Sequence, residues 1–385
     1  MMKMVAWQRV KDGLEDISPI VSDMWPMEMV DGLYHRAKVV QRICYQNIHT
    51  GSWSEVPMVW RDAYQATCLL LGVMLIDRDA HHDAIQEFDK GLLLGGNIFR
   101  SRIHSIIEMM SVDDEVWPDD VYVTSDCEHP GSSWQEARTW QAVPHEVNFH
   151  DMALDTFLVK YLSKHVPVLV RGLAREWPAC TLWNQKSYWK NRIAAARTVP
   201  VEIGQDYMAA DWTQQLMPFV EFLERMEEEQ GKRVYLAQHD LFDQIPRLAK
   251  DIVIPDYCTS PHVQRRIWIG PAGTKTPIHH DPYENIFCQI VGYKYILLYP
   301  PEAAPYLELD ISGMAPNTST LDIDDPGSNK IMPHHLDAMH TECILGPGDA
   351  LYIPQGWYHF IKSLTTSFSV SFWWEQHHME EPDID

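Results

Sequence analysis

Residues 276–300 read TPIHHDPYENIFCQIVGYKYILLYP, a run of strand-like apolar segments that also carries two adjacent histidines, an aspartate and a lysine. In extended backbone, side chains two residues apart point to the same side. His279 and Asp281 therefore converge, while His280 points away. This spacing predicts that the first two bind one metal ion and that His280 does not. Alone it is a weak signal, because a surface pair has the same spacing.

A third ligand is expected from residues 348–363, GDALYIPQGWYHFIKS, in which His359 enters a strand after a Gly and Pro turn. Two histidines and one carboxylate on one face, with positions left open, are typical of the non-haem iron(II) oxygenases. A bidentate oxo-acid and dioxygen need those open positions. The sequence therefore favours a metal centre of His279, Asp281 and His359.

A lysine follows the metal motif closely. Gly292-Tyr293 fits a two-residue type II′ turn, which would pair Val291 with Lys294 in a hairpin. Counting back by twos, the residues on the face of Lys294 are Asn285, Phe287 and Gln289. A lysine inside a barrel is costly unless it meets an anion, so an interior Lys294 predicts a carboxylate ligand. The alternative is a lysine that reaches solvent from a hairpin end.

The composition limits the class of partner. The chain has 385 residues, and 54 acidic against 31 basic residues give a net charge of −23. Such a charge repels nucleic acid and anionic membranes, so we expect neither as a partner. The seven scattered cysteines contain no CxxC pair, which indicates free thiols. With no leader and no bilayer-length apolar run, we expect a soluble protein of the nucleus, the cytoplasm or both.

Two parts of different character follow one another. Residues 57–96 contain two helix-length segments, and the second has Ala84, Phe88 and Leu92 on one stripe. Together they resemble a tetratricopeptide-type hairpin, although one copy supports only an irregular helical domain. A further amphipathic helix is expected within residues 149–165. The side chains predicted to share its buried face are Leu154, Phe157, Leu158, Tyr161 and Leu162.

After this helix the pattern changes to short β segments: RIWIG, IFCQIV, KYILLYP, DALYIP and SFSVSFWW. In the last, serines alternate with apolar residues, the period of a strand with one polar face. Many short strands broken by Gly and Pro predict a barrel or jelly roll.

Together, these motifs resemble the Jumonji-C oxygenases from about Val166 to Trp374, and more loosely around VWRDAY in the helical part. The resemblance implies an α+β protein whose C-terminal double-stranded β-helix (cupin or jelly-roll) domain follows an α-helical, tetratricopeptide-like domain. The expected boundaries are 1–110 for the helical domain, 111–145 for a linker, 146–376 for the Jumonji-C domain and 377–385 for an acidic tail.

The resemblance also implies roles for individual residues. His279, Asp281 and His359 match the ligands of Fe(II), and Lys294 matches the residue that pairs with the C5 carboxylate of 2-oxoglutarate. Further contacts to that co-substrate are expected from Tyr235, Thr276 and Asn285. Glu202 and Trp268 match positions around the target side chain, where a carboxylate and an aromatic ring suit a cation.

The expected activity is dioxygenase chemistry that consumes O2 and 2-oxoglutarate and hydroxylates a protein side chain. Arginine is the expected target, because the Glu202 carboxylate opposite Trp268 favours a guanidinium. Histone methyl-lysine demethylation at the same centre is the alternative, and a catalytically silent scaffold is the third. The partner is a protein or peptide with a basic side chain. A peptidase is disfavoured, because neither HExxH nor GxSxG is present.

Overall fold

The computed structural model describes residues 27–110, 121–122, 144–189, 197–228, 231–311, 315–323, 336 and 339–376. The N-terminal 26 residues, most of the expected linker and the expected acidic tail lie outside these residues. The chain divides into two compact units. One contains Met1–Trp117, Trp189–Val199 and Leu216–Glu221, and the other contains Pro118–Tyr188, Pro200–Gln215 and Phe222–Asp385.

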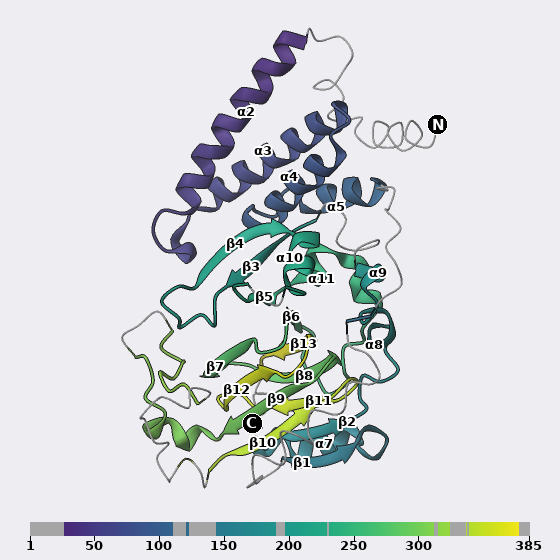
Figure 1. The fold of residues 1–385 in the computed structure, drawn as a ribbon, viewed down its shortest axis with the longest axis vertical. Helices are drawn as coiled ribbons and strands as arrows, with labels where there is room; N and C mark the ends of the chain where they lie inside the picture. The colour runs from purple at the N-terminus through teal and green to yellow at the C-terminus, as the bar shows by residue number, and fades with distance from the viewer. Residues whose placement is uncertain are drawn as a thin grey trace, which may run out of the picture. The chain divides into compact units, whose positions relative to one another are not determined.

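The first unit is built on four helices, drawn in purple to blue in Figure 1: α2 (Met27–Ile48), α3 (Met58–Asp77), α4 (His81–Leu94) and α5 (Arg100–Met109). Helices α3 and α4 are the two predicted from the sequence. The predicted stripe on α4 is buried, with Ala84, Phe88 and Leu92 exposed by 0, 0 and 3 %. A Cβ at Gly72 of α3 would lie 2.1 Å from a ring carbon of Phe88. Glycine is thus required where the two helices approach.

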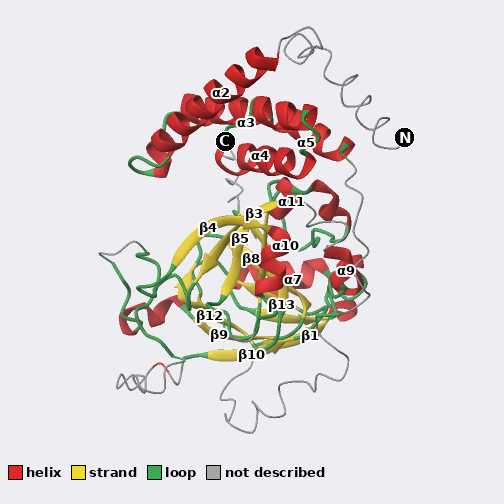
Figure 2. Cartoon of the chain, turned by 45° about the horizontal axis from the view of Figure 1, so that its top comes forward, coloured by secondary structure: helices red, strands yellow, loops and turns green. Residues whose placement is uncertain are grey.

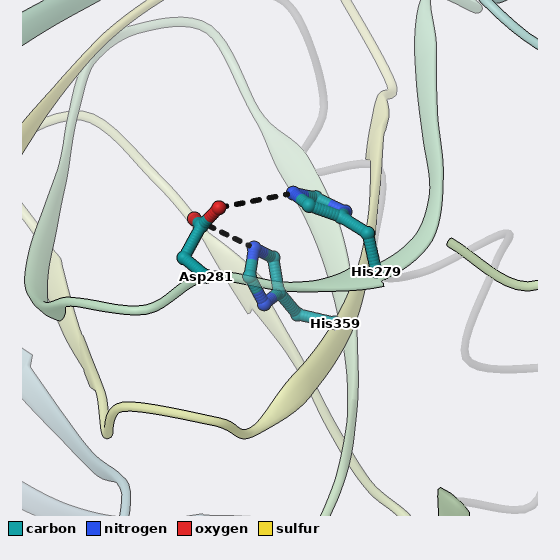
Figure 3. A group of neighbouring side chains, drawn as sticks. All are labelled: His279, Asp281 and His359. Atoms are coloured by element: carbon teal, nitrogen blue, oxygen red, sulfur yellow. Dashed lines mark ion pairs between the residues drawn. The ribbon is translucent and has the colours of Figure 1, made fainter. Parts of the chain in front are cut away.

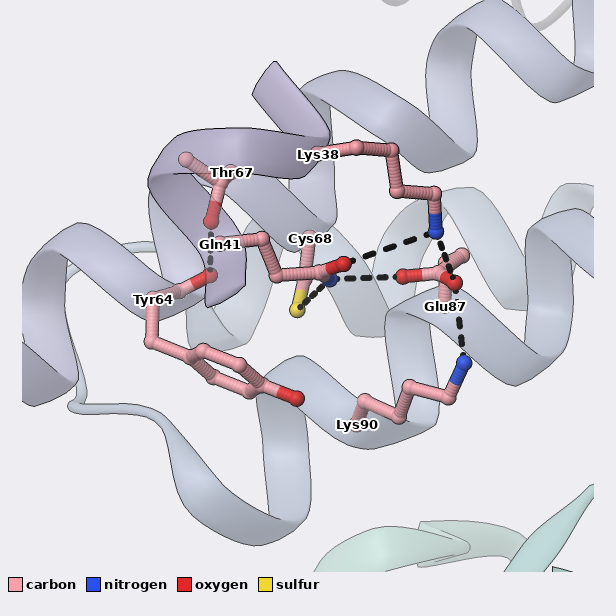
Figure 4. Close-up of polar contacts among 7 residues, drawn as sticks. All are labelled: Lys38, Gln41, Tyr64, Thr67, Cys68, Glu87 and Lys90. Atoms are coloured by element: carbon pink, nitrogen blue, oxygen red, sulfur yellow. Dashed lines mark hydrogen bonds and ion pairs between the residues drawn. The ribbon is translucent and has the colours of Figure 1, made fainter. Parts of the chain in front are cut away.

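The first unit also buries charged groups in pairs. On α4, the Asp89 carboxylate accepts two hydrogen bonds from Arg197 Nε, at 3.1 and 2.9 Å, and one from Arg197 Nη2 at 2.6 Å. It also accepts the backbone N–H of Thr198 at 2.7 Å. On the same helix, Glu87 joins Lys38, Gln41 and Lys90 in a network (Figure 4).

Two sheets form the second unit. The larger has the order β1-β2-β11-β8-β13-β6-β5-β3-β4, and the smaller has the order β10-β9-β12-β7. Figure 2 shows these strands, in yellow, curving around one another. The strands are β1 (His145–Asn148), β2 (Val168–Arg171), β3 (Thr198–Ile203), β4 (Thr213–Pro218), β5 (Val234–His239), β6 (Gln264–Gly270), β7 (Lys275–His280), β8 (Glu284–Val291), β9 (Lys294–Tyr299), β10 (Thr341–Leu345), β11 (Ala350–Ile353), β12 (Tyr358–Ser363) and β13 (Ser367–Trp374). The predicted cupin-type β fold is confirmed.

Short helices connect and flank these strands: η3 (Phe149–Asp151), α7 (Leu154–Lys160), η4 (Leu162–Lys164), α8 (Pro178–Leu182), α9 (Lys186–Tyr188), α10 (Phe219–Arg225), α11 (Leu241–Gln244), η6 (Pro246–Lys250) and η7 (Pro301–Tyr306). None of the helices in the described part of the chain is long and apolar enough to cross a membrane.

The space between the sheets holds polar as well as apolar side chains. Apolar residues of both sheets, including Phe287 of β8 and Ile296 of β9, form one buried cluster. The serines that alternate along β13 point into the same space. Ser369 donates to Gln289 at 2.7 Å, and Ser371 accepts from the Trp268 indole at 3.0 Å. The polar face read from the sequence is therefore an interior face.

The predicted hairpin is wrong. Strand β8 pairs with β11 and β13, whereas β9 pairs with β10 and β12 in the other sheet. Gly292-Tyr293 therefore connects the two sheets, and Val291 does not pair with Lys294. Gly292 has a φ of +74°, and a Cβ there would lie 2.0 Å from the Thr366 carbonyl oxygen. This corner needs a glycine in the left-handed region because a neighbouring backbone passes so close.

One further prediction needs correction. The helix expected within residues 149–165 is broken into η3, α7 and η4. Phe157, Tyr161 and Leu162 are buried, as expected of its inner face, but Leu154 is 43 % exposed. Leu154 opens the short helix α7 and projects from its first turn to the surface.

Candidate metal centre and co-substrate cavity

Three side chains from two neighbouring strands meet at one point (Figure 3). His279 lies near the end of β7, and Asp281 follows that strand. His359 lies directly opposite His279 on β12. The Nε2 atoms of the two histidines lie 3.9 and 3.6 Å from the Asp281 carboxylate oxygens. One potential ligand atom from each residue lies within 4.8 Å of the others, so the group could hold a metal ion.

Both imidazole rings are held in the orientation that metal binding needs. Nδ1 of His279 lies 2.9 Å from the Pro277 carbonyl oxygen, and Nδ1 of His359 lies 3.0 Å from that of Trp357. Since a carbonyl only accepts, each Nδ1 carries the proton and each Nε2 keeps a free lone pair. Burial is the larger cause, and the nearby His279 the second, of a pKa for His359 that is lowered to about 4. This ring is therefore neutral at physiological pH.

His280 is turned away from this group. Its ring lies edge-on against Tyr358, with centroids 5.0 Å apart. Its backbone N–H donates to the Asn317 carbonyl at 3.2 Å. Burial lowers its pKa. The side chain thus packs on the outer side of the strand, the side that strand alternation predicts.

The three side chains open into a small cavity between the two sheets. Besides the three, five residues singled out from the sequence line it: Tyr235, Trp268, Thr276, Asn285 and Lys294. Phe287 and Ile361 add apolar surface. Asn285 and Phe287 of β8 thus share a space with Lys294 of β9, although the predicted hairpin does not exist. They meet because both strands present these residues to the gap between the sheets.

Lys294 is the most unusual group in the cavity. Its side chain is 1 % exposed. Its Nζ donates to the Tyr235 hydroxyl at 3.3 Å and lies 5.4 Å from the centre of the Phe287 ring. No carboxylate of the described residues lies within ion-pair distance of it, and burial lowers its pKa to about 7. A buried ammonium in such surroundings is strongly stabilised by an anionic ligand.

The polar groups around Lys294 have unused hydrogen-bonding capacity. The buried Asn285 Oδ1 has no hydrogen-bond partner among the described residues. Thr276 and Tyr235 both line the cavity beside Lys294. Buried polar atoms are nearly always paired in folded proteins. A buried cation and an orphaned amide oxygen beside a three-residue donor set fit a metal ion together with a polar, anionic ligand.

Glu202 lies beside this cavity rather than in its wall. It pairs in register with Tyr235 between β3 and β5. Burial raises the pKa of the Glu202 carboxyl, and a hydrogen bond from the Trp212 indole, at 3.3 Å, partly opposes that rise. Trp212 was not identified from the sequence, because it lies in a loop with no strand period. The one hint in the sequence is that Trp212 follows the acidic strand residue Glu202 by ten positions, close enough for the two side chains to meet.

Comparison with known proteins agrees with this geometry. A family model for a cupin-like domain matches residues 154–380, and a model for KDM8-like N-terminal ARM repeats matches residues 27–120. The chain is 35 % identical to lysine-specific demethylase JMJ30 of Arabidopsis thaliana, over 90 % of this chain and 87 % of that one. It is 32 % identical to lysine-specific demethylase 8 of Danio rerio, over 88 and 87 %. It is 34 % identical to Jumonji C domain-containing protein 5 of Drosophila melanogaster, over 86 and 84 %.

This chain belongs to the Jumonji-C oxygenase family. It is an Fe(II)- and 2-oxoglutarate-dependent enzyme of that family, as the sequence predicted. The helical part of this Jumonji-C protein is more specifically like ARM repeats than like tetratricopeptide repeats. The helical character expected of it is confirmed.

Proposed function

We propose that this protein hydroxylates an arginine side chain of a protein substrate. The observation that carries the proposal is Glu202, a half-buried carboxylate beside the cavity that has no ion pair to a described cation. A guanidinium can pair with such a carboxylate through two parallel hydrogen bonds. The indoles of Trp268 and Trp212 offer faces on which its plane can stack.

The residues of the chain have separate tasks in this proposal. His279, Asp281 and His359 would hold Fe(II), leaving positions open for the co-substrate and dioxygen. Lys294 would pair with the distal carboxylate of 2-oxoglutarate, with hydrogen bonds from Tyr235, Thr276 and Asn285. The bound iron with 2-oxoglutarate and O2 supplies the oxidising power, so that a substrate C–H becomes C–OH while 2-oxoglutarate becomes succinate and CO2.

The protein contributes orientation and a dry site. The apolar side chains of Phe287 and Ile361 surround the ligand groups and exclude water. Glu202 would fix the guanidinium so that one substrate carbon faces the metal. No described side chain has to move a proton in this chemistry, which explains why the residues of the site are ligands rather than acid–base pairs.

Methyl-lysine demethylation is the second candidate, favoured by the lysine-specific demethylase names of the relatives. The same centre would hydroxylate an N-methyl carbon, which then leaves as formaldehyde. The aromatic rings of Trp268 and Trp212 suit a methylated ammonium as well as a guanidinium. Under either reading we propose a protein partner with a basic side chain, in the nucleus or cytoplasm.

Mass spectrometry separates the two activities. The full chain is incubated with Fe(II), 2-oxoglutarate and matched peptides that carry either arginine or methyl-lysine. Gain of one oxygen on arginine supports the proposal, whereas loss of a methyl group with release of formaldehyde supports demethylation. Failure to convert 2-oxoglutarate to succinate with any peptide would favour the scaffold reading.

A variant tests the assignment of Glu202. Glu202→Gln keeps the size of the side chain but removes the charge, so kcat/KM for the arginine peptide should fall at least about tenfold, the loss of one charge-assisted contact. The affinity for 2-oxoglutarate should not change, because Lys294 and its neighbours are untouched. Equal kcat/KM for Glu202→Gln and the unaltered protein would contradict the guanidinium assignment.

A further inference from the structure

A second concave surface lies on the other side of the large sheet. It is a groove whose lining includes Phe149, Leu154, Trp177, Val253, Ile254 and Asp256; we call it the outer groove. Trp177 packs edge-on against Phe372 of β13, with centroids 5.8 Å apart. The neighbours of Phe372 on that strand, Ser371 and Trp373, line the catalytic cavity. Since strand side chains alternate, the two hollows are on opposite faces of the sheet.

The outer groove presents apolar side chains to solvent. Val253, Ile254, Leu154 and Phe149 are exposed by 58, 43, 43 and 39 %. Single exposed apolar residues are common on protein surfaces. Four of them around one concave surface mark an interaction site.

The segment that carries Val253 and Ile254 is firmly anchored at both ends. Before it, the buried Asp251 carboxylate accepts hydrogen bonds from the Trp183 indole, at 2.9 Å, and from the Tyr188 hydroxyl. After it, the Tyr257 hydroxyl donates to the Met152 carbonyl at 2.8 Å. The Tyr257 ring also packs on Phe157, with centroids 4.7 Å apart. The exposure of the two aliphatic side chains is therefore fixed by the fold.

The backbone of this segment is also free to form hydrogen bonds with an added peptide. Val253 and Ile254 lie outside any helix, turn or strand, and their peptide groups make no hydrogen bond to the described residues. Ile254 precedes a proline, a position that favours extended backbone. Pro255 then ends the run, because it has no N–H to offer. An extended peptide can add alongside such a segment through main-chain hydrogen bonds while its side chains enter the adjacent groove.

Charge indicates which peptide would fit. The exposed Asp256 borders the groove directly after the extended segment. The chain as a whole carries a net charge of −23, which favours cationic partners. In an added strand, a basic side chain two residues after an apolar one points to the same side, so it would meet Asp256 when the apolar side chain fills the groove.

We propose that the outer groove is a docking site for an extended segment of another protein, with a large apolar side chain followed two residues later by a basic one. The segment adds as a short strand to Val253 and Ile254 and places its apolar side chain against Trp177. This function is separate from the chemistry of the cavity and does not depend on whether arginine or methyl-lysine is the target.

A labelled peptide tests the docking site directly. The probe is fluorescein-labelled Ser-Thr-Val-Phe-Val-Arg-Thr-Ser, titrated with the full chain and followed by fluorescence anisotropy. We expect saturable binding, at least tenfold weaker for Val253→Asp. Val159→Asp is the matched control, because Val159 is 64 % exposed but does not line the groove. Absence of saturation up to millimolar protein, or equal binding by the two variants, would overturn the proposal.

Two further measurements define the mode of binding. Hydrogen exchange at the amides of Val253 and Ile254 should slow when the peptide is bound, and a peptide with N-methylated valines should bind at least tenfold more weakly. Unchanged exchange at both amides would contradict strand addition. Sedimentation that shows a concentration-dependent dimer, lost in Val253→Asp, would assign the groove to a second copy and overturn the proposal. Succinate production by Val253→Asp should equal that of the unaltered protein.

Discussion

The helical unit and the catalytic cavity both bury charged side chains, but they treat them in opposite ways. In the helical unit, burial alone would raise the pKa of Glu87, yet hydrogen bonds from Lys38, Lys90 and Gln41 outweigh it and lower the pKa (Figure 4). In the cavity, burial lowers the pKa of Lys294 to about 7, and no anion of the described chain opposes it.

The same contrast holds for the fully buried groups. Asp89 has no exposed surface, and its carboxylate accepts hydrogen bonds from Arg197 and from the Thr198 N–H. Asn285, equally deep in the cavity wall, leaves its Oδ1 without a described partner. A saturated set of buried polar groups fixes a structure, whereas an unsaturated set is completed by something that binds. This difference distinguishes the structural network of the helical unit from the ligand site of the cavity.

Removing a ligand of the metal centre should have the largest effect. His279→Ala or Asp281→Ala leaves only two donors, so we expect iron binding and turnover to fall below detection. Iron content by atomic absorption and succinate production measure the two losses. The control is His280→Gln, which alters the adjacent ring outside the cavity and should keep most of the activity. Equal losses at positions 279 and 280 would contradict the assignment of the ligands.

Breaking the buried pair of the helical unit should cost the most stability. Asp89→Ala removes a buried carboxylate that accepts from Arg197 and Thr198, and breaking a buried ion pair typically lowers the free energy of unfolding by about 3 to 5 kcal/mol. Urea unfolding of the full chain, followed by circular dichroism, measures the loss.

An exposed pair in the same unit provides the matched control. Arg78 and Asp31 form an ion pair in which both side chains are partly in solvent. Asp31→Ala should therefore cost no more than about 1 kcal/mol. The double variant Asp89→Ala, Arg197→Leu should regain part of the loss, since it removes the buried guanidinium together with the carboxylate that pairs with it. Arg197→Leu alone completes the comparison. If the double variant loses as much unfolding free energy as Asp89→Ala and Arg197→Leu lose in total, Asp89 contributes packing rather than charge pairing.

The sequence predicted those features that have a local period. Helix α4, strands such as β8, β9 and β13, and the alternation of His279 and Asp281 can be read from spacings of two, three or four residues, because in each case one element presents the whole pattern. The role of Asp89 could not be read in this way, because its partner Arg197 lies 108 residues away in the sequence. Only the tertiary fold shows that the two side chains meet.

Lys294 shows how a correct expectation can rest on a wrong intermediate step. The local sequence Gly292-Tyr293 fits a hairpin turn, but strand pairing is decided by packing across the whole sheet, and here it sends the next strand into the other sheet. The interior position of Lys294 was still predictable, since the rest of its strand, residues 295–299, is apolar or aromatic. The structure buries β9 at every residue. Trp212, in a loop without a period, was not.

Replacing Lys294 should weaken co-substrate binding without weakening the fold. Lys294→Met removes one charge-assisted contact, about 1.5 to 3 kcal/mol, so the Kd for 2-oxoglutarate should rise by roughly 10- to 150-fold. Its unfolding free energy should stay equal or increase, because an unpaired buried ammonium is lost. Isothermal titration and urea unfolding measure the two effects. A fold destabilised as much as by Asp89→Ala would place Lys294 with the structural charges.

The smallest effect concerns pH and follows from the lowered pKa of Lys294. In the free protein the amine is about half charged near pH 7 and mostly neutral above it. A bound carboxylate favours the charged form and raises this pKa, so binding above pH 7 takes up a proton. The Kd for 2-oxoglutarate should therefore rise by up to about tenfold per pH unit between pH 7.5 and 8.5. Calorimetry in two buffers of different ionisation enthalpy detects the proton directly. Lys294→Arg, which stays charged, should bind without proton uptake, and uptake that persists in this variant would assign the proton to another group.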